Sequence, residues 1–192
     1  PTRGELHEPV AVIPALDIAV SPAIIFTNML RDGKIIEPGN ISITIQSHIN
    51  EKNKPAKINL YNGQKIAWSI DTVLDLEPGK QFIFSAPVSA LKNGDINGHL
   101  YASAIINYNG ENTIFNKRIH SIHYEHIPDI NYLATDSLKI SNEKIVIAQK
   151  RIAYIEGAGD KVEAALRQMG YLVTVLHESD ITLQKLNSFD VV

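Results

Sequence analysis

The chain has 192 residues, of which 44% are hydrophobic and 20% are charged, a composition typical of a globular protein and not of a disordered segment. Its 18 Lys and Arg against 21 Asp and Glu give a formal net charge of -3, which argues against a nucleic-acid partner, because such partners require a basic face. The chain has no cysteine, which excludes disulfides, thiolate metal sites and cysteine nucleophiles, and no apolar run has the length of a membrane span.

Residues 1–14 are expected to form an N-terminal linker, and residues 15–126 contain short runs in which apolar and polar residues alternate. Asn-Gly at 62–63, 93–94, 97–98 and 109–110 favours tight hairpins, because both residue types tolerate positive φ. Strands at this spacing predict an immunoglobulin-like antiparallel β-sandwich without the Cys…Trp…Cys hallmark of antibody domains. The expected strands cover residues 15–20, 23–26, 41–46, 58–60, 66–70, 82–84, 100–106 and 114–124.

The aromatic residues of this half raise the question of a sugar-stacking surface. Trp68 alternates in phase with Ile66 and Ile70, which favours a buried core tryptophan. Tyr101 and Tyr108 are expected to be exposed and keep a carbohydrate site open.

Three histidines, His120, His123 and His126, raise the question of a metal site. The flanking apolar residues favour a strand, in which His123 points away from the other two. His120 and His126 would then stand about 20 Å apart, at roughly 3.3 Å per residue, too far to share a zinc ion with bonds of about 2.0 Å. We therefore expect surface or corner-capping histidines and no metal site.

Residues 127–149 are expected to link two halves of the chain, because Pro128 cannot continue a central strand. Leu138 and Ile140, and then Ile145 and Ile147, alternate around a polar turn. This part is compatible with a short strand or with a pair of extended linker segments.

Residues 150–192 follow a different pattern, which predicts the first part of a β-α-β-α-β unit that is truncated at Val192. Apolar runs at 152–155 and 172–176 are typical of strands covered on both faces. Between them, Asp160 is suited to the N-cap of a helix and Gly170 to its C′ position. The apolar stripe of this helix is Val162, Ala165, Leu166 and Met169; a second short helix, capped by Ser179 or Asp180, would turn Leu183 and Leu186 inward.

The turn at Gly157 and Gly159 resembles a phosphate-binding turn at a helix N-terminus, where free N–H groups favour an anion. A dinucleotide fingerprint requires a third glycine at the position of Val162. In addition, the carboxylate of Asp160 would occupy the place of the phosphate. Gly157, Gly159 and Asp160 are therefore weak candidates for a nucleotide or flavin site, and plain strand-to-helix geometry is favoured.

The run RIAYIEGAGDKVEAALRQMGY, together with the upstream HYEHIPD corner, resembles the C-terminal region of large bacterial PIG-L (LmbE-like) family deacetylases. In that family a zinc-dependent N-acetylglucosaminyl deacetylase module precedes a β-sandwich and an α/β domain similar to class I glutamine amidotransferases. The piece LEPGKQFIF at 76–84 is also similar to sandwich domains appended to bacterial glycoside-processing enzymes.

One departure from the family decides what the resemblance implies. The catalytic signature, a His-Pro-Asp-Asp-Glu run, is absent, and His7-Glu8-Pro9 has similar letters in the wrong order. The zinc site and the catalytic module would therefore lie upstream, and the nucleophile elbow of an amidotransferase would lie beyond Val192. No catalytic residue, metal ligand or cofactor is carried over to this chain.

The resulting hypothesis is a non-catalytic spacer or docking segment of a PIG-L-like deacetylase that acts on N-acetylglucosamine-type sugars. Its expected partner is the upstream deacetylase module, and the resemblance implies an exported bacterial protein. A carbohydrate-binding sandwich is the first alternative, and a nucleotide or flavin site at residues 157–160 is the second.

Overall fold

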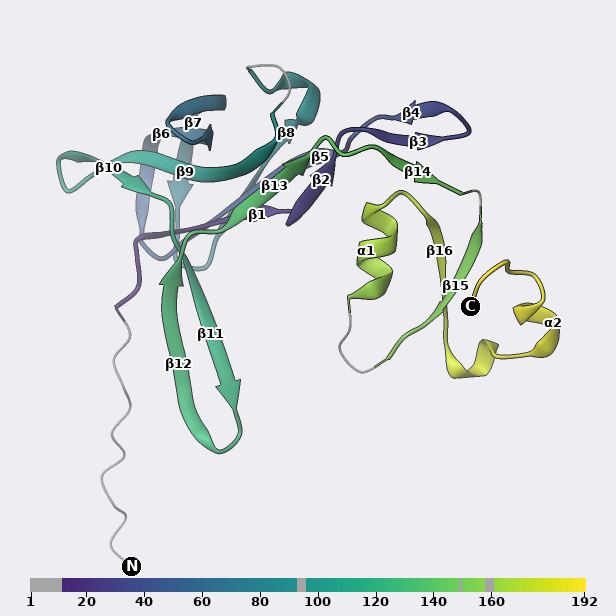
Figure 1. The fold of residues 1–192 in the computed structure, drawn as a ribbon. Coiled ribbons are helices and arrows are strands. Elements are labelled where there is room, and N and C mark those ends of the chain that lie inside the picture. The colour runs from purple at the N-terminus through teal and green to yellow at the C-terminus, as the bar shows by residue number, and fades with distance from the viewer. Residues whose placement is uncertain (1–11, 93–95, 149, 158–160) are drawn as a thin grey trace, which may run out of the picture.

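The computed structural model describes residues 12–92, 96–148, 150–157 and 161–192, and these residues are mainly β (Figure 1). Two sheets form the larger part. The first is three-stranded and antiparallel, in the order β1-β5-β8, with β1 at Leu16–Ser21, β5 at Asn40–Ser47 and β8 at Gln81–Pro87. A 3₁₀ turn, η1 (Val88–Ala90), follows β8.

The second sheet is six-stranded, in the order β2-β13-β9-β6-β7, with β10 also paired to β9. All its pairs are antiparallel except β2 with β13. Its strands are β2 (Ile24–Phe26), β6 (Glu51–Asn62), β7 (Lys65–Leu76), β9 (Gly98–Tyr108), β10 (Glu111–Phe115) and β13 (Ser137–Ser141). We refer to the two sheets together as the two-sheet unit.

One hydrophobic core lies between these sheets, and strict alternation places its residues. Ile41, Ile43 and Ile45 of β5 are fully buried, as are Ile58 and Leu60 of β6. Burying a side chain of this size stabilises a fold by about 1.5–3 kcal/mol. The predicted strands with inward-facing isoleucines and alanines are therefore confirmed, and the chain is mainly β as expected.

The predicted inward phase of Ile66, Trp68 and Ile70 is only partly right. A register shift in the pairing of β6 with β7 leaves Ala67 as the extra residue, since Leu60 is opposite Trp68 while Tyr61 is opposite Ile66. Ala67 is fully buried and Trp68 is half-buried against the core, whereas Ile66 and Ile70 are both exposed. A bulge inserts one residue into the alternation, and for this reason the period-2 pattern gave the wrong side for Ile66.

Of the two alternatives for residues 127–149, the structure has strands and not a plain linker, including Ser137–Ser141 and Ile145–Ile147, where the apolar residues alternate. The long strand expected at 114–124 is divided. β10 stays on the larger sheet, whereas β11 (Arg118–Tyr124) leaves it and pairs with β12 (Ile127–Ala134) as a hairpin. Pro128 is tolerated in β12 because the hairpin has two strands and both are edges. β13 is then an internal strand between β2 and β9, and β14 (Ile145–Ile147) pairs with β3.

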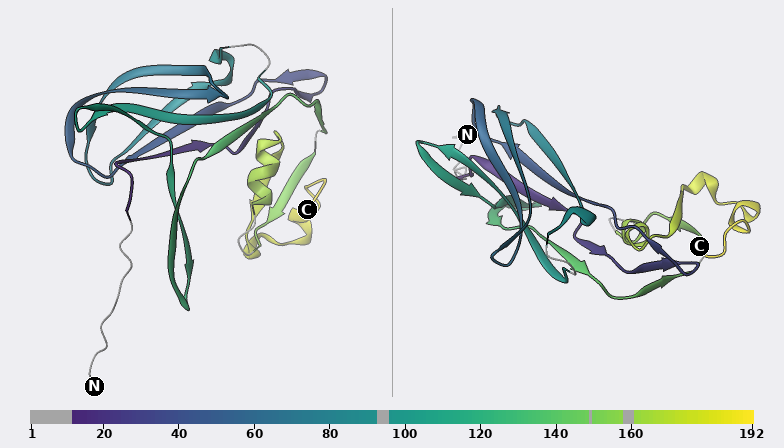
Figure 2. Two further views of the ribbon diagram at one scale, coloured as in Figure 1. Left: turned by 60° about the vertical axis from the view of Figure 1, so that its left-hand side comes forward. Right: turned by 90° about the horizontal axis from the view of Figure 1, so that it is seen from above.

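β3 (Met29–Arg31), β4 (Lys34–Ile36) and β14 form a separate three-stranded sheet at one end of the two-sheet unit. Ile147 of β14 lies opposite Arg31 of β3. This small sheet faces the C-terminal part of the chain, as the views in Figures 1 and 2 show.

The C-terminal part contains a parallel pair, β15 (Arg151–Ile155) and β16 (Leu172–Leu176), joined by α1 (Val162–Gln168). Ile152 also forms a parallel bridge to Val191, so β15 is the middle member of the order β16-β15-Val191. The predicted glycine cap is confirmed, because Gly170 has φ +83° and the N–H groups of Gly170 and Tyr171 bond the carbonyls of Arg167 and Leu166.

The helices of this part differ from their predictions. No residue of α1 is buried, and Leu183 of α2 (Leu183–Leu186) is exposed instead of pointing inward. Two strands and a bridge offer too little sheet surface to cover both helices. Thr182, and not Ser179 or Asp180, caps α2 by accepting from the N–H of Lys185; Asp180 lies in a 3₁₀ turn, η2 (Glu178–Asp180). Lys161 is at the N-cap position of α1, and Asp160 lies outside the described residues.

Candidate functional site

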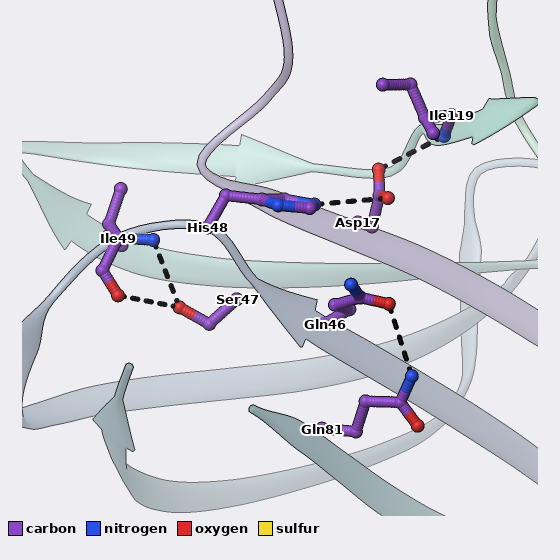
Figure 3. Close-up of polar contacts among 7 residues, drawn as sticks. All are labelled: Asp17, Gln46, Ser47, His48, Ile49, Gln81 and Ile119. Carbon is purple, nitrogen blue, oxygen red and sulfur yellow. Dashed lines mark hydrogen bonds and ion pairs between the residues drawn. The ribbon is translucent and has the colours of Figure 1, made fainter. Parts of the chain in front are cut away.

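The hairpin β11–β12 is fixed at its root by a buried carboxylate, that of Asp17 on β1. Asp17 is 8% exposed, and its Oδ1 accepts from the backbone N–H of Ile119 at 3.1 Å (Figure 3). Its Oδ2 lies 3.2 Å from Nε2 of His48, which must donate because a carboxylate only accepts. The N–H of Ile18 also bonds the carbonyl of Lys117 at 2.9 Å. These contacts determine where the hairpin leaves the two-sheet unit.

Beyond its root the hairpin extends away from both sheets, as the views in Figures 1 and 2 agree. On one face Ile122 lies opposite Ile130 and His120 lies opposite Tyr132. A register shift after Ile122 adds one residue to β12, so that Tyr124, two residues after Ile122 and on the same face of β11, lies opposite Ile127 near the tip. The exposed large hydrophobic residues of the hairpin are Ile122, Tyr124, Ile127, Ile130, Tyr132 and Leu133. Neither face is covered by another described part of the chain.

The three histidines lie on this hairpin but do not converge. His120 stacks on Tyr132 with ring centroids 5.2 Å apart, and its Nε2 lies 3.2 Å from Asp136 Oδ1 without hydrogen-bonding geometry. His123 pairs with Asp129, while His126 is in the turn at the tip. Among the described residues, no group of three or more His, Cys, Asp or Glu side chains is placed to hold a metal ion.

The two candidate tyrosines lie on opposite faces of β9. Tyr108 packs on the core and meets Phe115 edge-on, whereas Tyr101 is 40% exposed on the outer face. They therefore cannot form one stacking platform. Instead, Tyr101 lies opposite Tyr61 of β6, and the ring of His99 stacks beside it at 6.4 Å between centroids. We call Tyr61, His99 and Tyr101 the aromatic cluster.

Two polar side chains lie buried on the same outer face as the aromatic cluster. Asn59 and Ser103 are directly opposite each other and are 0% and 3% exposed. Asn59 donates from Nδ2 to the hydroxyl of Tyr61 at 3.1 Å. Within the described part of the chain, Asn59 Oδ1 and Ser103 Oγ have no hydrogen-bond partner. The cross-strand pair next to the tyrosines therefore holds two buried polar oxygens that remain unpaired.

The turn expected to bind a nucleotide or flavin follows β15 at its carboxyl end. Gly157 is exposed there, but Gly159 and Asp160 lie outside the described residues. Sequence patterns indicate this turn and the tyrosines as candidate sites, but they do not indicate the contact between Asp17 and His48. The only sequence signal for Asp17 was an acidic residue inside the apolar run LDIAV.

No family model, curated protein or solved structure matches the chain. In the ranges that the structure describes, no helix is both long enough and apolar enough to cross a membrane.

Proposed function

We propose that this chain is a non-catalytic docking segment and that the β11–β12 hairpin is the element that docks. The observation that carries the proposal is the exposure of large apolar side chains along the hairpin, mostly on the face of Ile122, with Ile130 and Tyr132 each about half exposed, at 49% and 48%. The occupant that we propose is the deacetylase module of a PIG-L-like enzyme, as the sequence resemblance suggests.

The physical support comes from the energetics of an isolated hairpin. Two strands without a covered face are marginally stable in water at best. In this chain the hairpin gains its support at the root, from Asp17 and from the pairing of Ile18 with Lys117. A partner on the apolar face would bury Ile122, Ile130 and Tyr132, and surrounding His and Asp side chains would form a polar rim of the kind found at protein interfaces.

We further infer that the two-sheet unit is of immunoglobulin-like type and that the C-terminal part begins a flavodoxin- or amidotransferase-like unit. Support for the first is the shared core between antiparallel sheets. Support for the second is the order β16-β15-Val191, in which the first strand lies in the middle. We propose no catalytic or cofactor-binding role for either unit.

The docking proposal is tested by binding a separately produced PIG-L-type deacetylase module to the 192-residue chain in calorimetry. The Ile130→Lys and Tyr132→Ser variants should each weaken binding by about tenfold or more, because exposed aromatic and large apolar side chains carry most interface energy. Ile83→Lys is the matched control, since Ile83 is 68% exposed on β8, outside the hairpin. Equal affinity of the hairpin variants and the wild type would refute docking through this element.

The non-catalytic part of the proposal has its own test. The chain alone, supplied with zinc and N-acetylglucosamine oligomers, should release no acetate. Zinc-dependent turnover by these residues would contradict the proposal, whatever the hairpin binds.

A second candidate function, carbohydrate binding on the outer face, is favoured by the aromatic cluster. Tyrosine and histidine rings can stack on the apolar face of a sugar, and the unpaired oxygens of Asn59 and Ser103 belong to the next cross-strand pair on the same face. Titration with amino-sugar oligomers should then shift the NMR signals of Tyr61 and Tyr101. Tyr101→Ala should abolish the shifts while Tyr124→Ala, an exposed tyrosine of the hairpin, preserves them; unshifted signals in the wild type would exclude this candidate.

A further inference from the structure

A pocket of about 430 Å³ lies between the β14-β3-β4 sheet and the amino ends of β15 and β16. Its volume falls within the range of small-molecule sites. The charged residues that line it are Arg31, Lys150, Arg151 and Asp190, and its remaining wall includes Ile147 and Tyr171. The lining thus brings together three cationic side chains and one carboxylate from parts of the sequence that are far apart.

The one carboxylate in this lining, that of Asp190, is already paired with Arg151. Asp190 accepts from the backbone N–H of Arg151 at 2.8 Å and from its Nε at 3.3 Å. These bonds from Arg151 hold the pKa of Asp190 below its ordinary value. Among the described residues, Arg31 and Lys150 form no ion pair and their side chains make no hydrogen bond. Arg31 and Lys150 therefore have no carboxylate in direct contact, although Lys150 lies near enough to Asp190 to help lower its pKa.

The side chain of Arg31 lines the pocket and does not extend fully into solvent. Arg31 is half-buried, and a Cβ placed on Gly170 would lie 3.7 Å from its Nη2 and 2.9 Å from Ile147 Cδ1. The guanidinium of Arg31 therefore lies within van der Waals distance of the Gly170 position at the turn before β16, while the close approach that requires a glycine is that of Ile147. Lys34 is directly opposite Arg31 in the β3–β4 pair, and like charges in that arrangement destabilise a sheet. A bound anion would relieve this repulsion.

We propose that the pocket binds a small molecule bearing an oxyanion, a phosphate or a carboxylate, between the guanidinium of Arg31 and the ammonium of Lys150. Arginine suits this role because its planar fork matches two oxygens of either group. The uncharged part of the ligand would lie against Ile147 and Tyr171. This site is separate from the hairpin and does not depend on the proposed docking function.

The test is an NMR titration of the whole chain at constant ionic strength, with inorganic phosphate, glucose 6-phosphate and glucuronate as probes and glucose as the uncharged control. We expect saturable shifts of the Arg31 Nε and Lys150 amide signals with at least one anionic probe and none with glucose. The phosphate and carboxylate probes distinguish the two sources of the oxyanion. Absence of saturation with all three anionic probes would overturn the proposal.

Two variants assign the binding to these side chains. Arg31→Gln and Lys150→Gln should each weaken binding at least about tenfold, the usual effect of losing a charge-assisted hydrogen bond. Arg118→Gln is the matched control, because Arg118 pairs with Asp136 on the hairpin root and should bind as the wild type does. If Arg31→Gln fails to fold, Lys150→Gln decides the matter, because Lys150 is exposed. Equal weakening in all three variants, or in none, would refute a site at this pocket.

Discussion

Replacing Asp17 by alanine should release the root of the hairpin and destabilise the fold. The substitution removes the acceptor of the Ile119 N–H and of the His48 Nε2–H, which lie 3.1 Å and 3.2 Å from the carboxylate. The side chains of His48 and Asp17 are 19% and 11% exposed, so the His48 ring can rotate toward water, whereas the part-buried Ile119 N–H is fixed by its strand. Mainly one buried donor is therefore left unsatisfied.

The magnitude follows from the charge and the burial. A hydrogen bond to a charged group contributes about 1.5–3 kcal/mol, and an unsatisfied buried donor costs about 1–3 kcal/mol. We expect Asp17→Ala to lower the free energy of unfolding by about 2–3 kcal/mol, or the Tm by about 5–10 °C for a chain of this size. Asp17→Asn keeps a carbonyl oxygen for Ile119 and should cost about 1 kcal/mol.

The assay combines urea denaturation with amide hydrogen exchange. Exchange should accelerate at Ile119 and along β11 in Asp17→Ala before it changes in the two-sheet core. Asp75→Ala is the control, because Asp75 also accepts a backbone N–H, that of Asn53 at 2.9 Å, but at an exposed position; it should cost less than about 1 kcal/mol. Equal stability of Asp17→Ala and wild type, or unchanged protection of β11, would refute the anchoring role of Asp17.

Three further predictions concern the core and the C-terminal part. Ile58→Ala, at a fully buried site, should lower the free energy of unfolding by about 2–5 kcal/mol in urea titrations; a loss below about 1 kcal/mol would mean that the sheets do not share a packed core. Gly170→Ala should lower the free energy of unfolding by about 1–2 kcal/mol, because the backbone φ of this residue is +83°. An unchanged Tm would show that the turn is not left-handed. Asp190 should titrate below the ordinary carboxyl range in carboxyl-detected NMR, because Arg151 lowers its pKa. The contribution of ionised Asp190 to the stability of the fold is therefore present above the ordinary carboxyl pKa and is lost as the pH falls through the lowered pKa. A titration midpoint of Asp190 at the ordinary value would contradict the Arg151 contacts.

Local chemistry determined much of the fold. Alternating isoleucines on β5 and β6 identified the core face, because in an extended chain successive side chains point to opposite sides. Asn109 and Gly110 both have positive φ in the turn between β9 and β10, which is the conformation that the Asn-Gly pair favours. Gly170 ended α1 for the same reason. These features depend on a few neighbouring residues, so the sequence could predict them.

Pairing partners between distant segments were decided only by the tertiary structure. Nothing local indicates that β13 inserts between β2 and β9, that a bulge at Ala67 turns Ile66 outward, or that β11 leaves the sheet at Lys117. The same holds for both candidate sites. Asp17 meets Ile119 across 102 positions of the sequence, and Arg31 and Lys150 line one pocket only because β14 pairs with β3. Side-chain alternation predicts on which face of its own strand a residue lies. The contacts between strands depend on the packing of the whole chain, and a local sequence pattern does not predict them.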